Sequence, residues 1–333
     1  MDNIDLSFSY MRIPPPKSII KIIKTSLNNI NKYPSGDYTE LKEKLSNYVG
    51  AIPKNIIVGD GSDEIIDMIT RAFGDKVLIP TPTFSEYEES AQRRNSIIKK
   101  VNSFDGENYK INFSKKDIKN STLIWICSPN NPTGTIVPKE TIEEIVSQTK
   151  SIVAIDETFF EYSRETSVPL LKKYNNIIII RSLSKSFGIA GLRLGYAISN
   201  DKNIKILEKY RRLFNVNIIA ETVGIKIFNY VEYYENAIKK IKNIKDNFTN
   251  AIEKIGFHCI KSNAPFVFVA FKNINEMKFY YNELIKFGIK TFPSYSKDFS
   301  NSKIPFIRVS IGTENEMKKM INVIKQIQSN YRF

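Results

Sequence analysis

The stretch from residue 177 to residue 193 reads IIIIRSLSKSFGIAGLR. Its four consecutive isoleucines are typical of a short strand that is buried on both faces of a sheet. Lys185 follows this strand with a serine on either side, and Arg193 comes eight residues later. A single lysine is most often a solvated surface charge, but small and apolar surroundings lower the pKa of an amine and make it a nucleophile toward carbonyl groups. The stretch therefore predicts a buried strand with a reactive lysine at its carboxyl end.

The same strand pattern recurs through the centre of the chain and alternates with helical patterns. Short apolar runs bounded by turn residues lie at 56–58, 77–79, 123–127, 152–155 and 194–198. Apolar residues at helical spacing mark helices over 39–48, 62–73 and 139–149. This alternation predicts an α/β fold with a large, doubly wound and mainly parallel sheet, which binds ligands at the carboxyl ends of its strands.

The pattern changes after about residue 230. A long helix is expected over 231–255, followed by an alternating strand at 266–269, a helix at 277–287, a strand at 306–311 and a last helix at 314–329. This order predicts a smaller α+β unit. We expect a large domain of residues 31–230 and a small domain made of residues 1–30 together with residues 231–333.

Composition excludes several classes of protein. A chain of 333 residues with 42% apolar residues is long enough for about two domains, which argues against a disordered protein. Cys127, Cys259 and the single His258 exclude a disulfide scaffold and a metal site with several imidazoles. No window approaches the roughly 18 consecutive apolar residues of a membrane span, and the start carries acids instead of a basic signal region. These features predict a cytoplasmic protein without a metal site or a membrane partner.

The net charge of +14 raises the alternative of a basic, cofactor-free protein that binds a polyanion. However, 38 of the 49 basic residues are lysines, and they are scattered along the chain without a dense basic run. Nucleic-acid recognition favours arginine, because its guanidinium makes bidentate contacts with bases and phosphates. Solvated lysines are therefore the better interpretation, and we expect no nucleic-acid partner.

Three further segments place polar groups at the ends of strands or the starts of helices. The glycine turn before Ser62 and Asp63 leads into a helix whose free N–H groups could hold a phosphate. The turn SPNNPTG at 128–134 leaves the Asn131 side chain as a donor, and Asp156 directly follows a buried strand. Each also has a plain structural interpretation: a capped helix, an Asx turn or a structural carboxylate.

The ordered set of segments resembles the fold-type I pyridoxal-phosphate aminotransferases, and it is most similar to the histidinol-phosphate aminotransferase family. The segments are YP at 33–34, GSDEIID at 61–67, PTFSEY at 82–87, NPTG at 131–134, DE at 156–157, SLSK at 182–185, NVN at 215–217 and IRVSIGT at 307–313. The resemblance implies a pyridoxal 5'-phosphate cofactor, an amino donor and a 2-oxo acid as substrates, and a homodimer with shared active sites.

The resemblance also implies a role for each motif residue. Lys185 binds the cofactor covalently and then moves a proton between the substrate and the cofactor, so no catalytic histidine is needed. Asp156 pairs with the protonated pyridine nitrogen. Asn131 donates to the phenolic oxygen of the ring, and Phe84 lies against the ring face.

The remaining implied roles concern phosphate and substrate. The cofactor phosphate is expected at the backbone N–H groups of Ser62 and Asp63, the hydroxyls of Ser182 and Ser184, and the guanidinium of Arg193. Tyr33 is expected to reach the same phosphate from the neighbouring subunit. Arg308 is expected to bind the substrate carboxylate as a bidentate fork.

The sequence departs from the family where the substrate binds. Phe159 stands where the family has a tyrosine, so one hydrogen bond to the cofactor's phenolic oxygen is lost and Asn131 acts alone there. Phe292 stands where the family often has an arginine for the substrate phosphate, so a phosphate would need Arg12, Lys290 or Lys297. The expected reaction is transamination of histidinol phosphate with 2-oxoglutarate in histidine biosynthesis. An aminotransferase for aromatic or other unphosphorylated amino acids and a threonine-phosphate decarboxylase are the alternatives that share this cofactor site.

Overall fold

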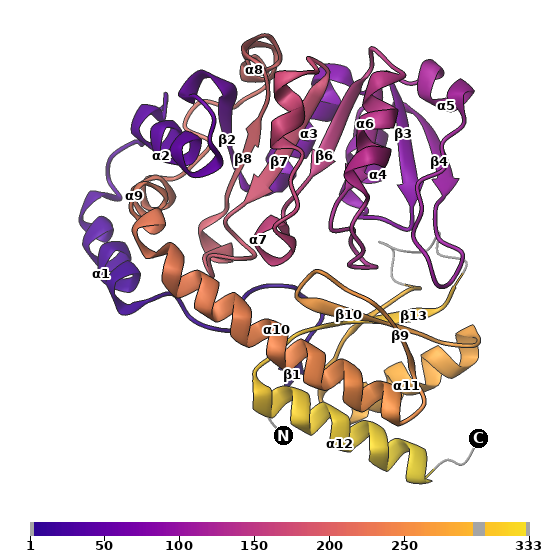
Figure 1. Ribbon diagram of the computed structural model, residues 1–333. Helices are drawn as coiled ribbons and strands as arrows, with labels where there is room; N and C mark the ends of the chain where they lie inside the picture. The colour runs from indigo at the N-terminus through magenta and orange to yellow at the C-terminus, as the bar shows by residue number, and fades with distance from the viewer. Residues whose placement is uncertain (1–2, 296–303, 331–333) are drawn as a thin grey trace.

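The computed structural model describes residues 3–295 and 304–330. A seven-stranded sheet forms the upper part of the molecule (Figure 1). In spatial order its strands are β2 (Ile56–Asp60), β8 (Leu194–Ile198), β7 (Ile177–Ser182), β6 (Ile152–Asp156), β5 (Leu123–Cys127), β3 (Lys76–Thr81) and β4 (Ile97–Asn102). Only β8 runs opposite to its neighbours β2 and β7. The predicted doubly wound, mainly parallel sheet is confirmed.

Helices cover both faces of this sheet (Figure 1). They are α2 (Thr39–Val49), α3 (Gly61–Phe73), α4 (Glu86–Arg93), α5 (Lys115–Asn120), α6 (Lys139–Ser147), α7 (Phe160–Ser163), α8 (Asp201–Glu208) and α9 (Ile218–Ile227). Strand β7 shows why two cores form: Ile177 and Ile179 pack into one apolar cluster, whereas Ile178 and Ile180 pack into the other. Side chains alternate along a strand, so a run of isoleucines fills the core on each face.

The lower part of the molecule contains a four-stranded antiparallel sheet. Its strands in spatial order are β12 (Phe292–Pro293), β13 (Phe306–Ser310), β10 (Phe266–Ala270) and β9 (His258–Ile260), and its helices are α10 (Val231–Lys254), α11 (Ile274–Lys286) and α12 (Glu314–Asn330). Helix α10 runs from the end of α9 to beneath this smaller sheet (Figure 1). The expected α+β unit after residue 230 is thus present.

The N-terminal segment contacts both parts of the molecule. Strand β1 (Ile4–Asp5) pairs in parallel with β11 (Ile289–Lys290), next to the smaller sheet. Helix α1 (Lys17–Ser26) instead packs against α9 of the large part. Short 3₁₀ turns occur at η1 (Leu27–Asn29), η2 (Pro53–Asn55), η3 (Val168–Lys172), η4 (Ala190–Leu192) and η5 (Phe228–Tyr230). The domain boundary at residues 30 and 31 stays a prediction.

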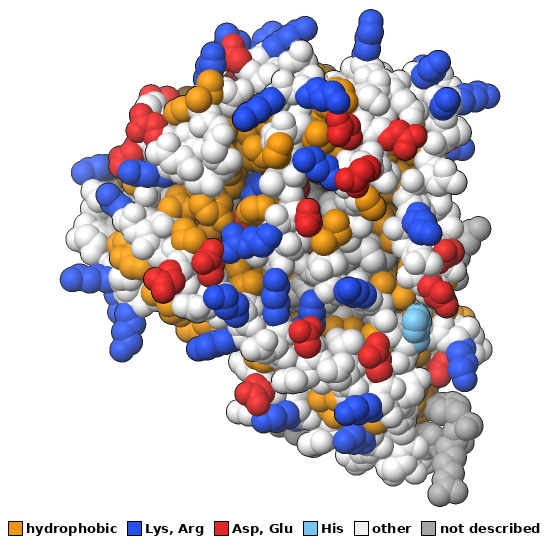
Figure 2. Space-filling view, in the orientation of Figure 1, with side chains coloured by type: hydrophobic (Ala, Val, Ile, Leu, Met, Phe, Trp, Pro, Cys, Tyr) orange, Lys and Arg blue, Asp and Glu red, His pale blue; other side chains and the backbone are white. Residues whose placement is uncertain are grey.

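Basic side chains are dispersed over the face of the molecule seen in Figure 2. Figure 2 shows Lys and Arg side chains scattered across this face and mixed with Asp and Glu, without a continuous basic band. No helix in the described ranges combines the length and the apolar character that a membrane crossing needs.

A buried ion pair ties β6 to β7. Arg181, at the end of β7, lies 2.7 Å from the carboxylate of Glu157, and their side chains are only 3% and 2% exposed. The hydroxyl of Thr166 and the N–H of Ser167 also donate to this carboxylate. The guanidinium carbon of Arg181 lies 3.5 Å from the ring centre of Phe160. Because both charges are paired and hydrogen-bonded, the pair is tolerated in the core.

Replacing Arg181 with methionine should lower the free energy of unfolding by about 3–5 kcal/mol, because the Glu157 carboxylate would remain buried without its cation. Urea denaturation of both proteins, followed by circular dichroism, measures the difference. Arg71→Met is the matched control: its ion pair with Asp67 is exposed, at 52% and 30%, and its loss should cost at most about 1 kcal/mol. Equal destabilisation by the two variants would contradict this account.

Candidate active site

A cavity of about 160 Å³ lies where the carboxyl edge of the large sheet meets the smaller sheet. Its lining residues are Phe8, Ser9, Ser62, Asp63, Phe84, Cys127, Asn131, Asp156, Thr158, Phe159, Ser182, Ser184, Lys185, Arg193, Phe292 and Arg308. Most of them end or follow β2, β3, β5, β6 or β7, whose carboxyl ends share one edge of the sheet. The topology therefore brings together side chains that lie far apart in the sequence.

One end of the cavity is suited to an anion. Helix α3 begins here, and the Arg193 guanidinium lies 2.5 Å from the Asp63 carboxylate. Gly61 has a φ of +74°, and a Cβ at this position would lie 2.3 Å from Nη2 of Arg193. The Ser184 hydroxyl is buried without a hydrogen-bond partner among the described residues. Free N–H groups of a helix, a guanidinium and an unpartnered hydroxyl form a site that fits a phosphate.

Lys185 lies in the turn after β7 and lines the middle of the cavity. Burial lowers the pKa of its amine, and the positive charges of Arg308 and Arg193 lower it further, against the opposite effect of Asp63 and Asp156. The hydroxyl of Tyr162 donates to the Lys185 carbonyl over 3.3 Å, and the hydroxyl of Ser186 donates to buried Glu161 over 2.8 Å. These two hydrogen bonds fix the turn, and the lowered pKa favours the neutral, nucleophilic form of the amine.

Asp156 ends β6 and is almost fully buried. One carboxylate oxygen accepts the N–H of Thr158 over 2.9 Å, and the other accepts the hydroxyl of Tyr87 over 2.6 Å. Burial raises the pKa of Asp156, while these hydrogen bonds act in the opposite direction. A buried carboxylate of this kind favours a cationic group beside it, such as a protonated ring nitrogen.

Asn131 and Arg308 connect the two sheets. Nη1 of Arg308, in β13, donates to the side-chain oxygen of Asn131 over 2.6 Å, and Nη2 donates to the carbonyl of Ser7 over 2.5 Å. Because its oxygen accepts from Arg308, the N–H groups of Asn131 are oriented as donors for a ligand in the cavity. The Arg308 guanidinium carbon lies 4.6 Å from the ring centre of Phe292 and 5.4 Å from that of Phe266.

Both departures from the family pattern line the cavity. Phe159 is buried and packs edge-to-face on Phe266, with 5.3 Å between ring centres. Phe292 is directly opposite Arg308 in the β12–β13 register. Two aromatic rings thus line the cavity where it adjoins the smaller sheet.

Three predicted site residues do not line this cavity. Tyr33 is 77% exposed, and its ring stacks on Phe214 with 4.7 Å between centres. The Arg12 guanidinium donates to the Asp5 carbonyl and the Tyr10 hydroxyl. Lys290 lies 3.9 Å from the Asp5 carboxylate, and its amine is 6.0 Å from the ring centre of Phe8, which does line the cavity. Lys297 lies outside the described residues. The roles of these residues stay predictions.

Several lining or contacting residues had no predicted role. Phe8 and Ser9 reach the cavity from the N-terminal segment, and the Ser9 hydroxyl lies 2.9 Å from that of Ser310. Thr158 and Tyr87 bind Asp156. Tyr87 was part of the PTFSEY segment, so a signal for it existed, but its partner is 69 positions away in the sequence.

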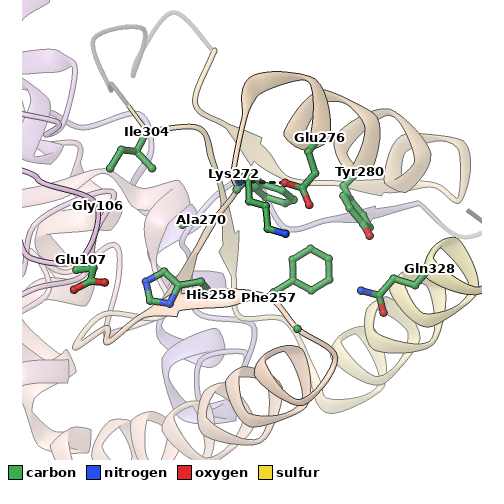
Figure 3. Close-up of a pocket in the computed structure, with 12 residues that line it drawn as sticks. Gly106, Glu107, Phe257, His258, Ala270, Lys272, Glu276, Tyr280, Ile304 and Gln328 are labelled. Atoms are coloured by element: carbon green, nitrogen blue, oxygen red, sulfur yellow. Dashed lines mark hydrogen bonds between the residues drawn. The ribbon is translucent and has the colours of Figure 1, made fainter. Parts of the chain in front are cut away.

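A second cavity, of about 760 Å³, is separate from this site (Figure 3). It lies between Gly106 and Glu107 of the large part and side chains of α11 and α12, including Glu276 and Gln328. It also holds His258, but within residues 3–295 and 304–330 no cluster of His, Cys, Asp and Glu could hold a metal ion.

A family model described as aminotransferase class I and II matches residues 2–324. The chain belongs to the class I and II aminotransferases. Histidinol-phosphate aminotransferase of Clostridium novyi is 33% identical to this aminotransferase over 323 residues, which cover 94% of this chain and 88% of that protein. The enzyme of the same name from Methanocaldococcus jannaschii is 32% identical over 328 residues, covering 95% and 86%.

Solved structures agree with the fold of the aminotransferase. The structure of histidinol-phosphate aminotransferase from Clostridium acetobutylicum matches with a TM-score of 0.89 and 26% identity, covering 98% of this chain and all of that chain. The relatives place the aminotransferase in the histidinol-phosphate aminotransferase family. Because the chain belongs to this family, the aminotransferase interpretation is favoured over that of a cofactor-free polyanion-binding protein.

Aminotransferases of this class use pyridoxal 5'-phosphate, and the residues in the cavity fit that group. The anion-binding end, with its unpartnered Ser184 hydroxyl, fits the phosphate. Asp156 fits the ring nitrogen, and Phe84 provides an apolar surface at the cavity wall. Lys185 lines the same cavity and has an amine that could bind the cofactor covalently.

Proposed function

We propose that this aminotransferase transfers the amino group of histidinol phosphate to 2-oxoglutarate in the biosynthesis of histidine. The observation that carries the proposal is the convergence of Lys185, Asp156, Asn131, Arg193 and Arg308 on one cavity of a chain whose relatives bear this name. Arg308 supplies the charge that acidic substrates need, because its guanidinium is buried and lines the same cavity as Lys185.

Pyridoxal phosphate, when bound, withdraws electrons from the substrate's α-carbon, which no side chain can do. The residues of the chain hold and orient the reactants. Arg193, the hydroxyls of Ser182 and Ser184 and the start of α3 bind the phosphate, while Asp156 and Asn131 fix the two polar edges of the ring. Lys185 would take the proton from the α-carbon as a neutral amine and deliver it to the cofactor's C4′ atom, which its lowered pKa favours.

A screen of amino donors tests the proposal. The purified holoenzyme is mixed in turn with histidinol phosphate, phenylalanine, tyrosine, glutamate and threonine phosphate, and the change in cofactor absorbance gives a rate for each half-reaction. Histidinol phosphate and glutamate should react fastest. Faster conversion of phenylalanine or tyrosine would replace the proposal with an aromatic aminotransferase, and release of carbon dioxide from threonine phosphate would replace it with the decarboxylase.

Arg308→Ala should lower kcat/KM about 100-fold or more for glutamate and histidinol phosphate together, because one guanidinium would bind the carboxylate of the first and the phosphate of the second. Steady-state kinetics with each substrate measures both losses. The combined variant Arg12→Ala and Lys290→Ala is the comparison: it should weaken only the reaction with histidinol phosphate. Loss with glutamate alone in Arg308→Ala would show that the phosphate binds elsewhere.

The proposed assembly is a homodimer in which Tyr33 of one subunit serves the phosphate site of the other. The supporting observation is an exposed apolar surface that includes Ile30, Tyr33 and Leu213, exposed by 65%, 77% and 73%. Such exposure is typical of a surface that another protein covers. Mixing inactive Lys185→Ala with a Tyr33→Ala variant tests it, since shared sites would restore activity to mixed dimers and separate sites would not. A cytoplasmic location stays a prediction.

A further inference from the structure

Tyr87, in α4, contacts two residues that the proposed function places around the cofactor ring. Its side chain is fully buried, and its hydroxyl donates to Oδ2 of Asp156 over 2.6 Å. Its ring and that of Phe84 form a T-shaped contact, with 5.7 Å between centres and an angle of 89°. Its ring face stacks on Trp125, with centres 4.5 Å apart and planes 10° from parallel. The tyrosine is therefore fixed on one face and supports the site with its hydroxyl and its ring.

The hydroxyl has no packing reason to be present. Tyr87 lies among the apolar residues of α3 and β5, where a phenylalanine would fill almost the same volume. A buried hydroxyl is unfavourable unless it is hydrogen-bonded, and here it donates to a carboxylate, the strongest acceptor among side chains. Cys127, the other polar neighbour, donates its own S–H to the carbonyl of Pro129 over 3.3 Å.

The two hydrogen bonds to Asp156 have different consequences for its orientation. The N–H of Thr158 holds Oδ1 from the chain just beyond the strand. That bond alone would leave the carboxyl group able to turn about its Cβ–Cγ bond. The hydroxyl of Tyr87 binds the other oxygen, Oδ2, from helix α4, which lies 69 positions away in the sequence. Together the bonds fix the plane of the carboxylate.

We propose that Tyr87 is a positioning residue for the cofactor ring, which orients the Asp156 carboxylate and holds its negative charge through the hydroxyl while its ring supports Phe84. The proposal rests on the proposed function only in assigning Asp156 and Phe84 to the ring. It deepens that function by tracing the orientation of the ring-binding carboxylate to a side chain that lies behind the cavity wall.

Tyr87→Phe tests the proposal in two ways. In the apoenzyme, carbon NMR of labelled aspartate gives the pKa of Asp156 without any cofactor. Loss of a hydrogen bond to a charged group should raise this pKa by about one to two pH units. In the holoenzyme, kcat with glutamate should fall about 10- to 100-fold with little change in KM, because substrate contacts remain intact.

Tyr234→Phe is the matched control. Tyr234 is also a buried tyrosine, but its hydroxyl has no hydrogen-bond partner among the described residues and it lies away from the cavity. Removing its hydroxyl should change neither the pKa of Asp156 nor kcat. An unchanged pKa of Asp156 in Tyr87→Phe, or a kcat within twofold of the wild type, would overturn the proposal.

A double-mutant cycle distinguishes an effect of Tyr87 through Asp156 from a general loss of packing. If Tyr87 acts through Asp156, adding Tyr87→Phe to Asp156→Asn should reduce kcat by less than threefold further. Additive losses would show that the tyrosine has only a structural role and overturn the proposal. The apoenzyme measurement stands apart from the identity of the reaction: if the holoenzyme converts no amino donor, the proposed function fails, while the pKa of Asp156 still decides the role of Tyr87.

Discussion

Lys185→Ala should lose transamination almost completely, with turnover reduced about 10⁴-fold or more, because one amine provides both the covalent attachment and the proton transfer. Product formation from glutamate with 2-oxo acids measures the loss. Borohydride reduction of the wild type followed by peptide mapping should place the pyridoxyl label on the peptide that contains Lys185. A label on another lysine would overturn the assignment of the whole site.

Lys245→Ala is the sharpest control for this result. Burial lowers the pKa of Lys245 as it does that of Lys185, so both amines differ from the many exposed lysines of the chain. Lys245 lies in α10, where its amine donates to the carbonyl of Ser262, and it does not line the cavity. Its loss should cost stability and leave turnover per folded enzyme unchanged. If Lys245→Ala loses turnover to a similar extent, the loss in Lys185→Ala does not depend on the position of Lys185 in the cavity.

The pH dependence of cofactor attachment follows from the direction of the Lys185 shift. The folded-state pKa of this amine is below its ordinary value of 10.5, so the neutral, nucleophilic form gains population at lower pH than it would for an exposed lysine. The rate at which the apoenzyme binds pyridoxal phosphate covalently should therefore rise with pH and reach half of its limiting value below pH 10.5.

The sequence predicted the part of the site that depends on strand ends. Buried runs of isoleucine and valine identify strands of a parallel sheet, and parallel strands necessarily bring their carboxyl ends to one edge. Asn131, Asp156 and Lys185 could thus be placed together before any coordinates were known. The edge strand β4 was not predicted from the sequence. Its sequence, IIKKVN, is largely exposed, and its two lysines interrupt the apolar run that identifies a buried strand.

Contacts between distant residues could not be predicted in the same way. The partner of Glu157 is Arg181, 24 positions further along the chain, and only the pairing of β6 with β7 makes them neighbours. The stacking of Phe292 on Arg308 depends on strand register in the smaller sheet. The hydrogen bond between Tyr87 and Asp156 depends on where α4 packs, which a tyrosine in an apolar helix face does not reveal.

Asp156→Asn should reduce turnover about 100- to 1000-fold while the enzyme still binds its cofactor. Asparagine keeps the size of the side chain and can still accept the N–H of Thr158, but it carries no negative charge to stabilise a protonated ring nitrogen. The substitution leaves Ser184 and Arg193, which are proposed to bind the cofactor phosphate, unchanged. Single-turnover rates at saturating pyridoxal phosphate, together with a cofactor titration, separate the two effects.

Arg193→Met should give the reverse result, because its guanidinium lies at the anion-binding end of the cavity, beside Asp63, instead of next to the reacting atoms. The affinity for pyridoxal phosphate should fall at least about tenfold, whereas turnover at saturating cofactor should fall much less. The opposite behaviour of the two variants is the decisive point, since general damage to the fold would lower affinity and turnover together in both. If Asp156→Asn keeps near-normal turnover, then Asp156 is only a structural carboxylate at the end of β6, and the charge that the reaction requires must come from elsewhere in the cavity.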